Sequence, residues 1–216
     1  EGAGEGVLIL NSDRGLCGPY NGSAGRTAMG QLRGADDPGR QVELVGKKGV
    51  NFLKFNGVNV ARHHTQFGDK PEFEDVQRLA QDYIDRFVAG RITGVRVIYM
   101  RYISVGRQTP ETLQLLPLKP PAIEKAGEGL TAQYEFSPPA EELLGSLLPE
   151  AVKATLFQCF NDAVVSEHIA RMVAMKAATD NAGKMGKSLT RQYNRARQAQ
   201  ITTELTEIIS GAAALE

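Results

Sequence analysis

Short apolar runs and amphipathic repeats alternate along the first half of the chain. Residues 6–11 form a continuous apolar run, which predicts a strand buried on both faces of a parallel sheet. Residues 71–88 repeat apolar side chains every three or four positions, the spacing of an amphipathic helix. The same patterns predict strands at 42–46, 58–63 and 95–105, helices at 23–32 and 47–55, a turn at 106–111 and a hairpin partner at 112–118. This alternation predicts an α/β fold, a Rossmann-like domain with a mostly parallel sheet and a hairpin at one edge.

The last third of the chain predicts one long helix. Residues 150–214 contain no proline and consist mostly of good helix formers. A helix that opens at Pro149, where proline is tolerated in the first turn, would have roughly 65 residues and a length of about 95 Å. We therefore divide the chain into a globular α/β domain at 1–137 and a C-terminal helix at 138–216. Residues 117–139, rich in proline, glycine and charge, are expected to connect the two, with one extended piece at 133–136.

Two stripes of small or apolar side chains recur at helical spacing on this predicted helix. A stripe of alanines in its middle would let another helix approach closely, and larger apolar side chains follow near its end. The alanines are Ala170, Ala174, Ala177, Ala178 and Ala182, and the later stripe is Ile201, Leu205, Ile208, Ile209 and Ala212. Because a small domain cannot cover so long a helix, both stripes predict a partner helix.

The same helix is locally basic. Between Arg171 and Arg197 it contains seven Lys and Arg residues and a single acid, Asp180, which gives a net charge of +6. A face of this kind is often simply solvated, and the alternatives are an acidic protein surface, nucleic acid or an anionic membrane. Tyr193 is the only aromatic residue among the bases, which weakens the nucleic-acid alternative.

Bulk composition excludes few functions. The chain has 25 basic and 25 acidic residues, so its net charge selects no partner. Cys17 and Cys159 stand in unrelated contexts, which indicates free thiols in a reducing compartment. No apolar run approaches the roughly 20 residues that span a bilayer, and no signal peptide is present. The chain begins without an initiator Met, which suggests the inside of a longer protein.

Candidate chemical motifs are weak, so we expect no catalytic constellation, cofactor or metal. The loop glycines Gly15, Gly18 and Gly22 do not have the dinucleotide-binding spacing, and no acid ends the second strand to bind a ribose. Residues 181–188 resemble a phosphate loop, but their flanks are helical. Adjacent His63 and His64 would point to opposite faces of a strand. A nucleotide-binding α/β enzyme with a helical appendage remains the alternative function.

Several long motifs resemble the gamma subunit of F-type ATP synthases. They are residues 172–182 (MVAMKAATDNA), 193–199 (YNRARQA) and 201–214 (ITTELTEIISGAAA), together with the loop 13–21 (DRGLCGPYN), in which Pro19 stands where glycine is more usual. Their order also agrees with the family, so the resemblance covers essentially the whole chain.

The resemblance implies a rotor without bond chemistry of its own. In this family an α/β foot carries two long helices that form an antiparallel coiled coil inside a ring of alpha and beta subunits, and the foot sits on the ring of c subunits beside epsilon (or delta). Proton-driven rotation then couples to ATP synthesis or hydrolysis. A peripheral location follows, on the cytoplasmic side of a bacterial inner membrane or the matrix side of a mitochondrial one, and no nucleic acid is expected.

The resemblance also assigns residues to these contacts. Contacts of the shaft with catalytic subunits are expected at Arg191, Arg195, Arg197, Gln198, Thr202 and Glu204. The shaft seam is expected at Ala170, Ala174, Ala177, Ala178, Ile201, Leu205 and Ile208. Foot contacts near the c ring are expected at Tyr134 and Phe136. The family's first long helix would precede Glu1, so we expect the seam of the remaining helix to be either mobile or covered by another chain.

Overall fold

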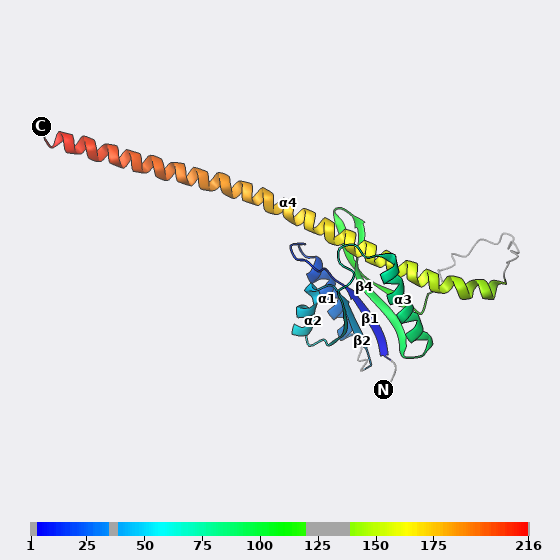
Figure 1. Ribbon diagram of the computed structural model, residues 1–216. Coiled ribbons are helices and arrows are strands. Elements are labelled where there is room, and N and C mark those ends of the chain that lie inside the picture. The colour runs from blue at the N-terminus through cyan, green and yellow to red at the C-terminus, as the bar shows by residue number, and fades with distance from the viewer. Residues whose placement is uncertain (1–3, 35–38, 120–138, 216) are drawn as a thin grey trace, which may run out of the picture. The chain divides into compact units, whose positions relative to one another are not determined.

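A computed structural model describes residues 4–34, 39–119 and 139–215 (Figure 1). Five strands and four helices are present in these ranges. The strands are β1 (Gly4–Leu10), β2 (Gln41–Val45), β3 (Val60–His64), β4 (Ile92–Ser104) and β5 (Arg107–Leu116). The helices are α1 (Tyr20–Arg33), α2 (Lys48–Phe55), α3 (Phe73–Val88) and α4 (Ala140–Ala213). The strands and helices predicted before residue 119 are all found, with bounds that differ by a few residues at most ends, whereas the extended piece predicted at 133–136 lies outside the described residues.

The strands form one sheet in the order β3-β2-β1-β4-β5. The first four strands are parallel, and β5 runs antiparallel to β4 as the predicted edge hairpin. Alternate residues of β1 face two separate cores, Val7 and Ile9 toward α1 and α2, Leu8 and Leu10 toward α3 and the first part of α4. Because β1 is buried on both faces, its sequence is a continuous apolar run. The predicted α/β fold with a mostly parallel sheet and a long C-terminal helix is confirmed.

The turn predicted at 106–111 is wrong. β5 already begins at Arg107, which pairs with Ser104, so the connection is the two residues Val105 and Gly106. The side-chain amide of Gln108 donates to the carbonyls of Ser104 and Val105 and ties the turn together. β5 contains Pro110, and because β5 is an edge strand, a residue without a backbone N–H is tolerated there.

The predicted start of the long helix at Pro149 is also wrong. α4 begins at Ala140 and contains Pro149 in its interior. Proline removes one backbone donor, and the carbonyl left without it belongs to Gly145, four residues earlier and exposed to solvent. Water can therefore bind this carbonyl, and the helix continues without a break.

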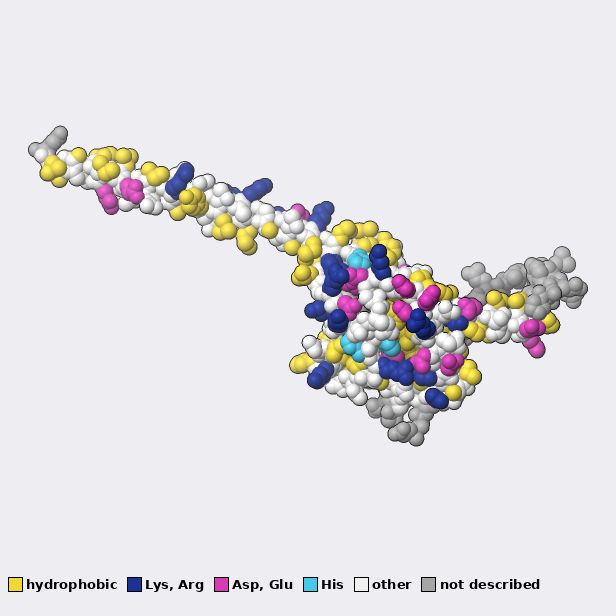
Figure 2. Space-filling model, in the orientation of Figure 1, with side chains coloured by type: hydrophobic (Ala, Val, Ile, Leu, Met, Phe, Trp, Pro, Cys, Tyr) yellow, Lys and Arg dark blue, Asp and Glu magenta, His cyan; other side chains and the backbone are white. Residues whose placement is uncertain are grey.

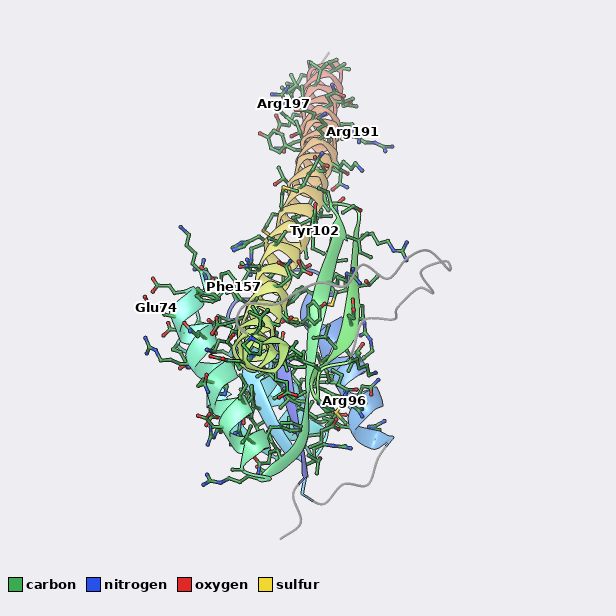
Figure 3. The ribbon with its side chains drawn as sticks, turned by 90° about the vertical axis from the view of Figure 1, so that its right-hand side faces the viewer. Glu74, Arg96, Tyr102, Phe157, Arg191 and Arg197 are labelled. Carbon is green, nitrogen blue, oxygen red and sulfur yellow. The ribbon has the colours of Figure 1, made fainter. Side chains whose placement is uncertain are left out.

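The chain divides into two compact units, residues 1–172 and 173–216. The first unit contains the sheet, α1 to α3 and the beginning of α4. Within it, Phe73 of α3 packs edge-to-face on Phe157 of α4, with ring centroids 5.2 Å apart. Figure 3 labels Phe157 on α4. The second unit is the rest of α4. The domain boundary predicted at 137 and 138 lies outside the described residues.

Candidate interaction surfaces

The second unit is a helix whose side chains are almost all exposed. From residue 175 onward only Ser188 is partly covered among the described residues. The helix runs unbroken through Gly183 and Gly186, and the hydroxyls of threonines such as Thr190 and Thr202 donate to carbonyls four residues back. Residues 181–188 therefore form no loop, and the resemblance to a phosphate loop has no structural counterpart.

Five bases lie on one face of this unit. At 100° per residue, Lys176, Lys184, Lys187, Arg191 and Arg195 fall within an arc of about 100°. Asp180 lies in the same arc and is the only acid there. We call these five residues the basic stripe. Dark blue side chains along one edge of the helix show the stripe in Figure 2.

The opposite face of the same segment is apolar. Steps of three or four residues along α4, the periodicity of a helix–helix seam, connect the members of this face. The members are Met175, Ala178, Ala182, Met185, Leu189 and Tyr193, which we call the apolar stripe. Met185 is 65% exposed and Leu189 57%, so the part of the chain that the structure describes does not cover this face. Figure 2 shows yellow side chains on the edge of the helix opposite the dark blue ones.

The apolar face changes sides nearer the C-terminus. Leu205 lies within the arc of the basic stripe, and Ile201 and Ile208 lie about 20° and 40° beyond its edge, whereas Glu204 and Glu207 lie toward the side of the apolar stripe. Figure 2 shows this exchange, with yellow side chains on the edge that was dark blue and magenta ones opposite. The two apolar segments of α4 therefore present different faces to their partners.

The predicted seam is consequently not brought together on one face. Ala170 packs against the buried cluster of Cys17, Tyr20 and Ala24 in the first unit, so it is already partly covered. Ala178 belongs to the apolar stripe. Ile201 lies 23 residues after Ala178, and at 100° per residue the two side chains point about 140° apart around a straight helix. Ala174 and Ala177 lie between the basic and apolar arcs, and Leu205 and Ile208 lie with Ile201.

The predicted contacts with catalytic subunits fall into two groups. Arg191, Arg195, Gln198 and Thr202 are spaced four, three and four residues apart and share the side of the basic stripe. Arg197 and Glu204 are seven residues apart on a neighbouring side. Arg191 and Arg197 accordingly point away from α4 on different sides in Figure 3. Tyr134 and Phe136, the predicted contacts near the c ring, lie outside the described residues.

The first part of α4 closes the carboxyl ends of the parallel strands, where ligands bind in sheets of this kind. The hydroxyl of Tyr20 donates to the carbonyl of Ala163 over 3.1 Å, and that of Ser166 donates to the carbonyl of Met100 over 3.1 Å. Tyr20 is 2% exposed, and burial raises the pKa of its hydroxyl far above the ordinary range. A cavity of about 30 Å³ is left beside these residues, room for about one water molecule.

A salt bridge extends this closure at the end of the first unit. Arg171 pairs with Glu167 across 2.5 Å and donates through Nε to the carbonyl of Gly15 over 3.3 Å. The loop after β1 is thereby joined to α4. Because α4 fills the crevice that a nucleotide would enter, the structure disfavours the alternative of a nucleotide-binding enzyme.

Sequence analysis missed a buried polar cluster around Glu43 of β2. Glu43 is 1% exposed and accepts hydrogen bonds from Arg86, Tyr83 and His64 at 2.8, 2.9 and 2.8 Å. Burial raises the pKa of the Glu43 carboxyl, but these hydrogen bonds outweigh burial and lower the pKa to about 2. His63 instead contacts the carbonyl of Gly46, so the two adjacent histidines have separate partners. The chemistry of the cluster is that of a structural ion pair tying α3 and β3 to β2.

The described residues contain neither a cluster of metal ligands nor a membrane-spanning helix. Nowhere do three or more potential metal ligands come together in these ranges. No helix within them has both the length and the apolar character that crossing a membrane requires. The surfaces of α4 therefore remain the principal candidate site.

The last helix of the chain fills the ligand crevice of the α/β domain and then presents stripes that the described residues leave uncovered. These two features define a subunit of a larger assembly. Comparison with known proteins identifies the assembly. A sequence model described as ATP synthase matches residues 2–215. The ATP synthase gamma chain of Rhodopirellula baltica is 43% identical over 217 residues, which cover 97% of this chain and 73% of the relative. The chain belongs to the ATP synthase gamma chain family.

Other similar proteins agree. The ATP synthase gamma chain of Staphylococcus haemolyticus is 37% identical over 213 residues, 98% of this chain and 74% of the relative. A chain of the Euglena gracilis mitochondrial ATP synthase, OSCP/F1/c-ring, has a TM-score of 0.68 at 20% identity, covering 99% of this chain and 73% of that one. A central stalk/c-ring chain from Tetrahymena thermophila has a TM-score of 0.58 at 20% identity, covering 82% and 76%. These two likenesses concern the fold.

Proposed function

We propose that the chain is the central-stalk subunit that couples proton-driven rotation of a c ring to conformational change in an alpha/beta catalytic hexamer. The observation that carries the proposal is the helix of the second unit, uninterrupted as far as Ala213, whose basic and apolar stripes lie on opposite faces and are left uncovered by the described residues. An exposed helix with two chemically different faces can contact a partner helix on one side and a surrounding ring on the other. Family membership supports this assignment.

The faces of α4 suggest which partner each one contacts. The basic stripe, extended by Gln198 and Thr202, suits acidic surfaces of the catalytic subunits, because opposite charges attract across an interface that turns. The apolar stripe suits a second helix of the shaft. The foot, with Tyr134 and Phe136, would contact the c ring beside epsilon or delta. These contacts make the chain a peripheral membrane protein on the cytoplasmic side, or the matrix side in a mitochondrion.

We propose further that the chain transmits force and performs no bond chemistry. α4 fills the crevice at the carboxyl ends of the strands, and hydrogen bonds from Tyr20, Ser166 and Arg171 fix it to the α/β body of the first unit. Force applied to the body is therefore passed to α4 through packed and hydrogen-bonded contacts. The cavity of about 30 Å³ beside them is too small for a nucleotide.

Assembly with catalytic subunits tests the proposal. The chain, and a version extended at its N-terminus with the first helix of a relative, are each co-expressed with alpha and beta subunits and purified through the alpha subunit. Co-purification of the gamma chain and rotation-dependent ATP hydrolysis are expected, more strongly for the extended version, because its added helix covers the apolar stripe. Absence of both chains from the purified alpha/beta complex would refute a central-stalk role. Charge reversal at Arg191, Arg195 and Arg197 that left coupled activity unchanged would refute the expected electrostatic contact.

A further inference from the structure

The two helical layers of the α/β body differ in charge. α1 contains Arg26 and Arg33, and α2 with the residue before it contains Lys47, Lys48 and Lys54, whereas neither helix contains an acid. On the other face of the sheet, α3 contains four acids and two bases. The layer of α1 and α2 is therefore a positive surface on a chain whose net charge is zero.

The bases of this layer make no ion pairs with the described residues. On α3, by contrast, Arg78 pairs with Asp75, and Arg86 pairs with Glu43. The carboxylate of Asp13 accepts from the backbone N–H of Lys47 over 3.1 Å. Asp36 and Asp37, which follow α1 in the sequence, lie outside the described residues. An anionic partner would thus meet cations that have no ion-pair partner among the described residues.

Phe55 adds an apolar anchor to the same face. Its side chain is 92% exposed, more than any other large apolar side chain of the described residues. It stands seven residues after Lys48, which places both on one side of α2, with Lys54 next to it in sequence. An exposed aromatic side chain surrounded by cations is typical of an interface anchor that enters an apolar recess of a partner.

Close packing fixes the position of this surface. A Cβ added at Gly25 of α1 would lie 2.6 Å from the Phe52 ring of α2, so the two helices meet where only glycine fits. On the other side, Gly49 of α2 lies against Leu44 of β2, where an added Cβ would be 2.9 Å away. This packing fixes the backbones from which the outward bases and Phe55 project, so no rearrangement of the two helices has to precede binding.

We propose that the outer face of α1 and α2 binds an acidic protein surface with an apolar recess for Phe55. A protein fits better than a lipid surface, because a membrane-bound helix buries a broad apolar face and α2 exposes only one large apolar side chain. A nucleic acid would be expected to use several stacking side chains, and this face offers one. The inference rests on the proposed function in one respect, since the partner is sought within the assembled ATP synthase.

Site-specific photo-crosslinking tests the inference. Phe55→p-benzoylphenylalanine is introduced into the chain in cells that also express the other ATP synthase subunits, and the complex is purified after irradiation. One cross-linked protein is expected, with the cross-link in a peptide rich in Asp and Glu. Adding Lys47→Glu, Lys48→Glu and Lys54→Glu should lower the cross-link yield about tenfold, as should high salt. The control Lys70→Glu, Arg78→Glu and Arg91→Glu reverses three exposed charges outside this layer and should leave the yield unchanged.

The two readouts of this experiment separate the inference from the proposed function. Co-purified alpha and beta subunits without a cross-link would overturn the acidic partner and leave the central-stalk role standing. A cross-link to an acidic protein without alpha and beta would support the surface and overturn the central-stalk role. A cross-link to lipid or nucleic acid, or equal losses from both triple variants, would overturn the inference. Circular dichroism confirms that each variant is folded before its yield is compared.

Discussion

Arg86 of α3 donates through Nη2 to Oε1 of Glu43 in β2 across 2.8 Å, and the two side chains are 8% and 1% exposed. The other carboxylate oxygen accepts from Tyr83 and contacts His64, so one buried carboxylate joins two strands and a helix. The guanidinium also lies 4.8 Å from the centroid of the Tyr83 ring. This cluster fixes α3 on the sheet at the same time as apolar packing does.

Removing the cation alone should destabilise the fold strongly. Arg86→Met leaves the Glu43 carboxylate buried without its main partner, which costs about 3–5 kcal/mol in comparable buried pairs. Glu43→Leu combined with Arg86→Met should recover most of that loss, because no uncompensated charge remains. Urea unfolding followed by circular dichroism gives both free energies of unfolding. A double variant no more stable than Arg86→Met would contradict the explanation.

Acid should remove the stability that the Glu43 carboxylate contributes. Its pKa is lowered from 4.5 to about 2 in the folded chain, so the stabilisation is fully present above pH 4.5 and is lost as the pH falls toward 2. The linked change is on the order of 3 kcal/mol, since one pKa unit corresponds to about 1.4 kcal/mol. Glu43→Gln should therefore show a shallower fall in the free energy of unfolding between pH 4.5 and 2. Equal slopes for the variant and the parent chain would rule out Glu43 as the group responsible.

Local patterns predicted elements such as β1, whose continuous apolar run reflects burial on both faces, with Val7 in one core and Leu8 in the other. The Glu43 cluster could not be predicted, because its partners lie 21 to 43 residues away and meet it only after the sheet and α3 have formed. The turn predicted at 106–111 and the helix start predicted at Pro149 were wrong, because Pro110 lies inside β5 and Pro149 inside α4. One proline lies on a sheet edge and the other on a solvated turn, and the sequence alone states neither position.

Local spacing likewise did not predict which residues of the candidate site share a face of α4. Gly183 and Gly186 lie between the two predicted stripes, and each costs about 1 kcal/mol in a helix interior. Only an unbroken α4 fixes the rotation that separates Ala178 from Ile201. The residue types of the stripes were therefore predictable, whereas the faces that they share were not.

Charge reversal on the basic stripe should lower ATP-driven proton pumping more than charge reversal on a neighbouring side of α4. In an assembled complex, Arg191→Glu with Arg195→Glu is expected to lower ATP-driven proton pumping about tenfold, because both side chains lie on the face proposed to meet acidic catalytic subunits. Arg197→Glu, on a neighbouring side, should have a smaller effect. Pumping is measured in vesicles by quenching of a pH-sensitive dye. The control Arg191→Lys with Arg195→Lys keeps the charge and should retain most of the activity, and a loss as large as that of the Glu variants would show that charge is not the cause.

The uncovered apolar stripe predicts that the second unit is protected only when another helix lies on it. A single helix in water opens readily, because most helical stability in proteins comes from packing of an apolar face. Amides of residues 173–213 in the monomeric chain should therefore exchange with solvent within seconds, while those of β1 and β4 stay protected. At higher chain concentration, or with a partner helix added, exchange in this segment should slow. A monomer with slow exchange through Ile209 would contradict the prediction.

Two substitutions assign this protection to one face of α4. Met185→Asp with Leu189→Asp places charges in the middle of the apolar stripe, so protection of the segment by a partner should be lost. Thr190→Asp places a charge outside the stripe, on a side chain that is likewise exposed, and should leave that protection intact. Hydrogen exchange read by mass spectrometry, with analytical ultracentrifugation of the same samples, measures protection and association together. If the stripe is the seam, both quantities fall together in the double variant, because covering Met185 and Leu189 is what holds the partner on the helix.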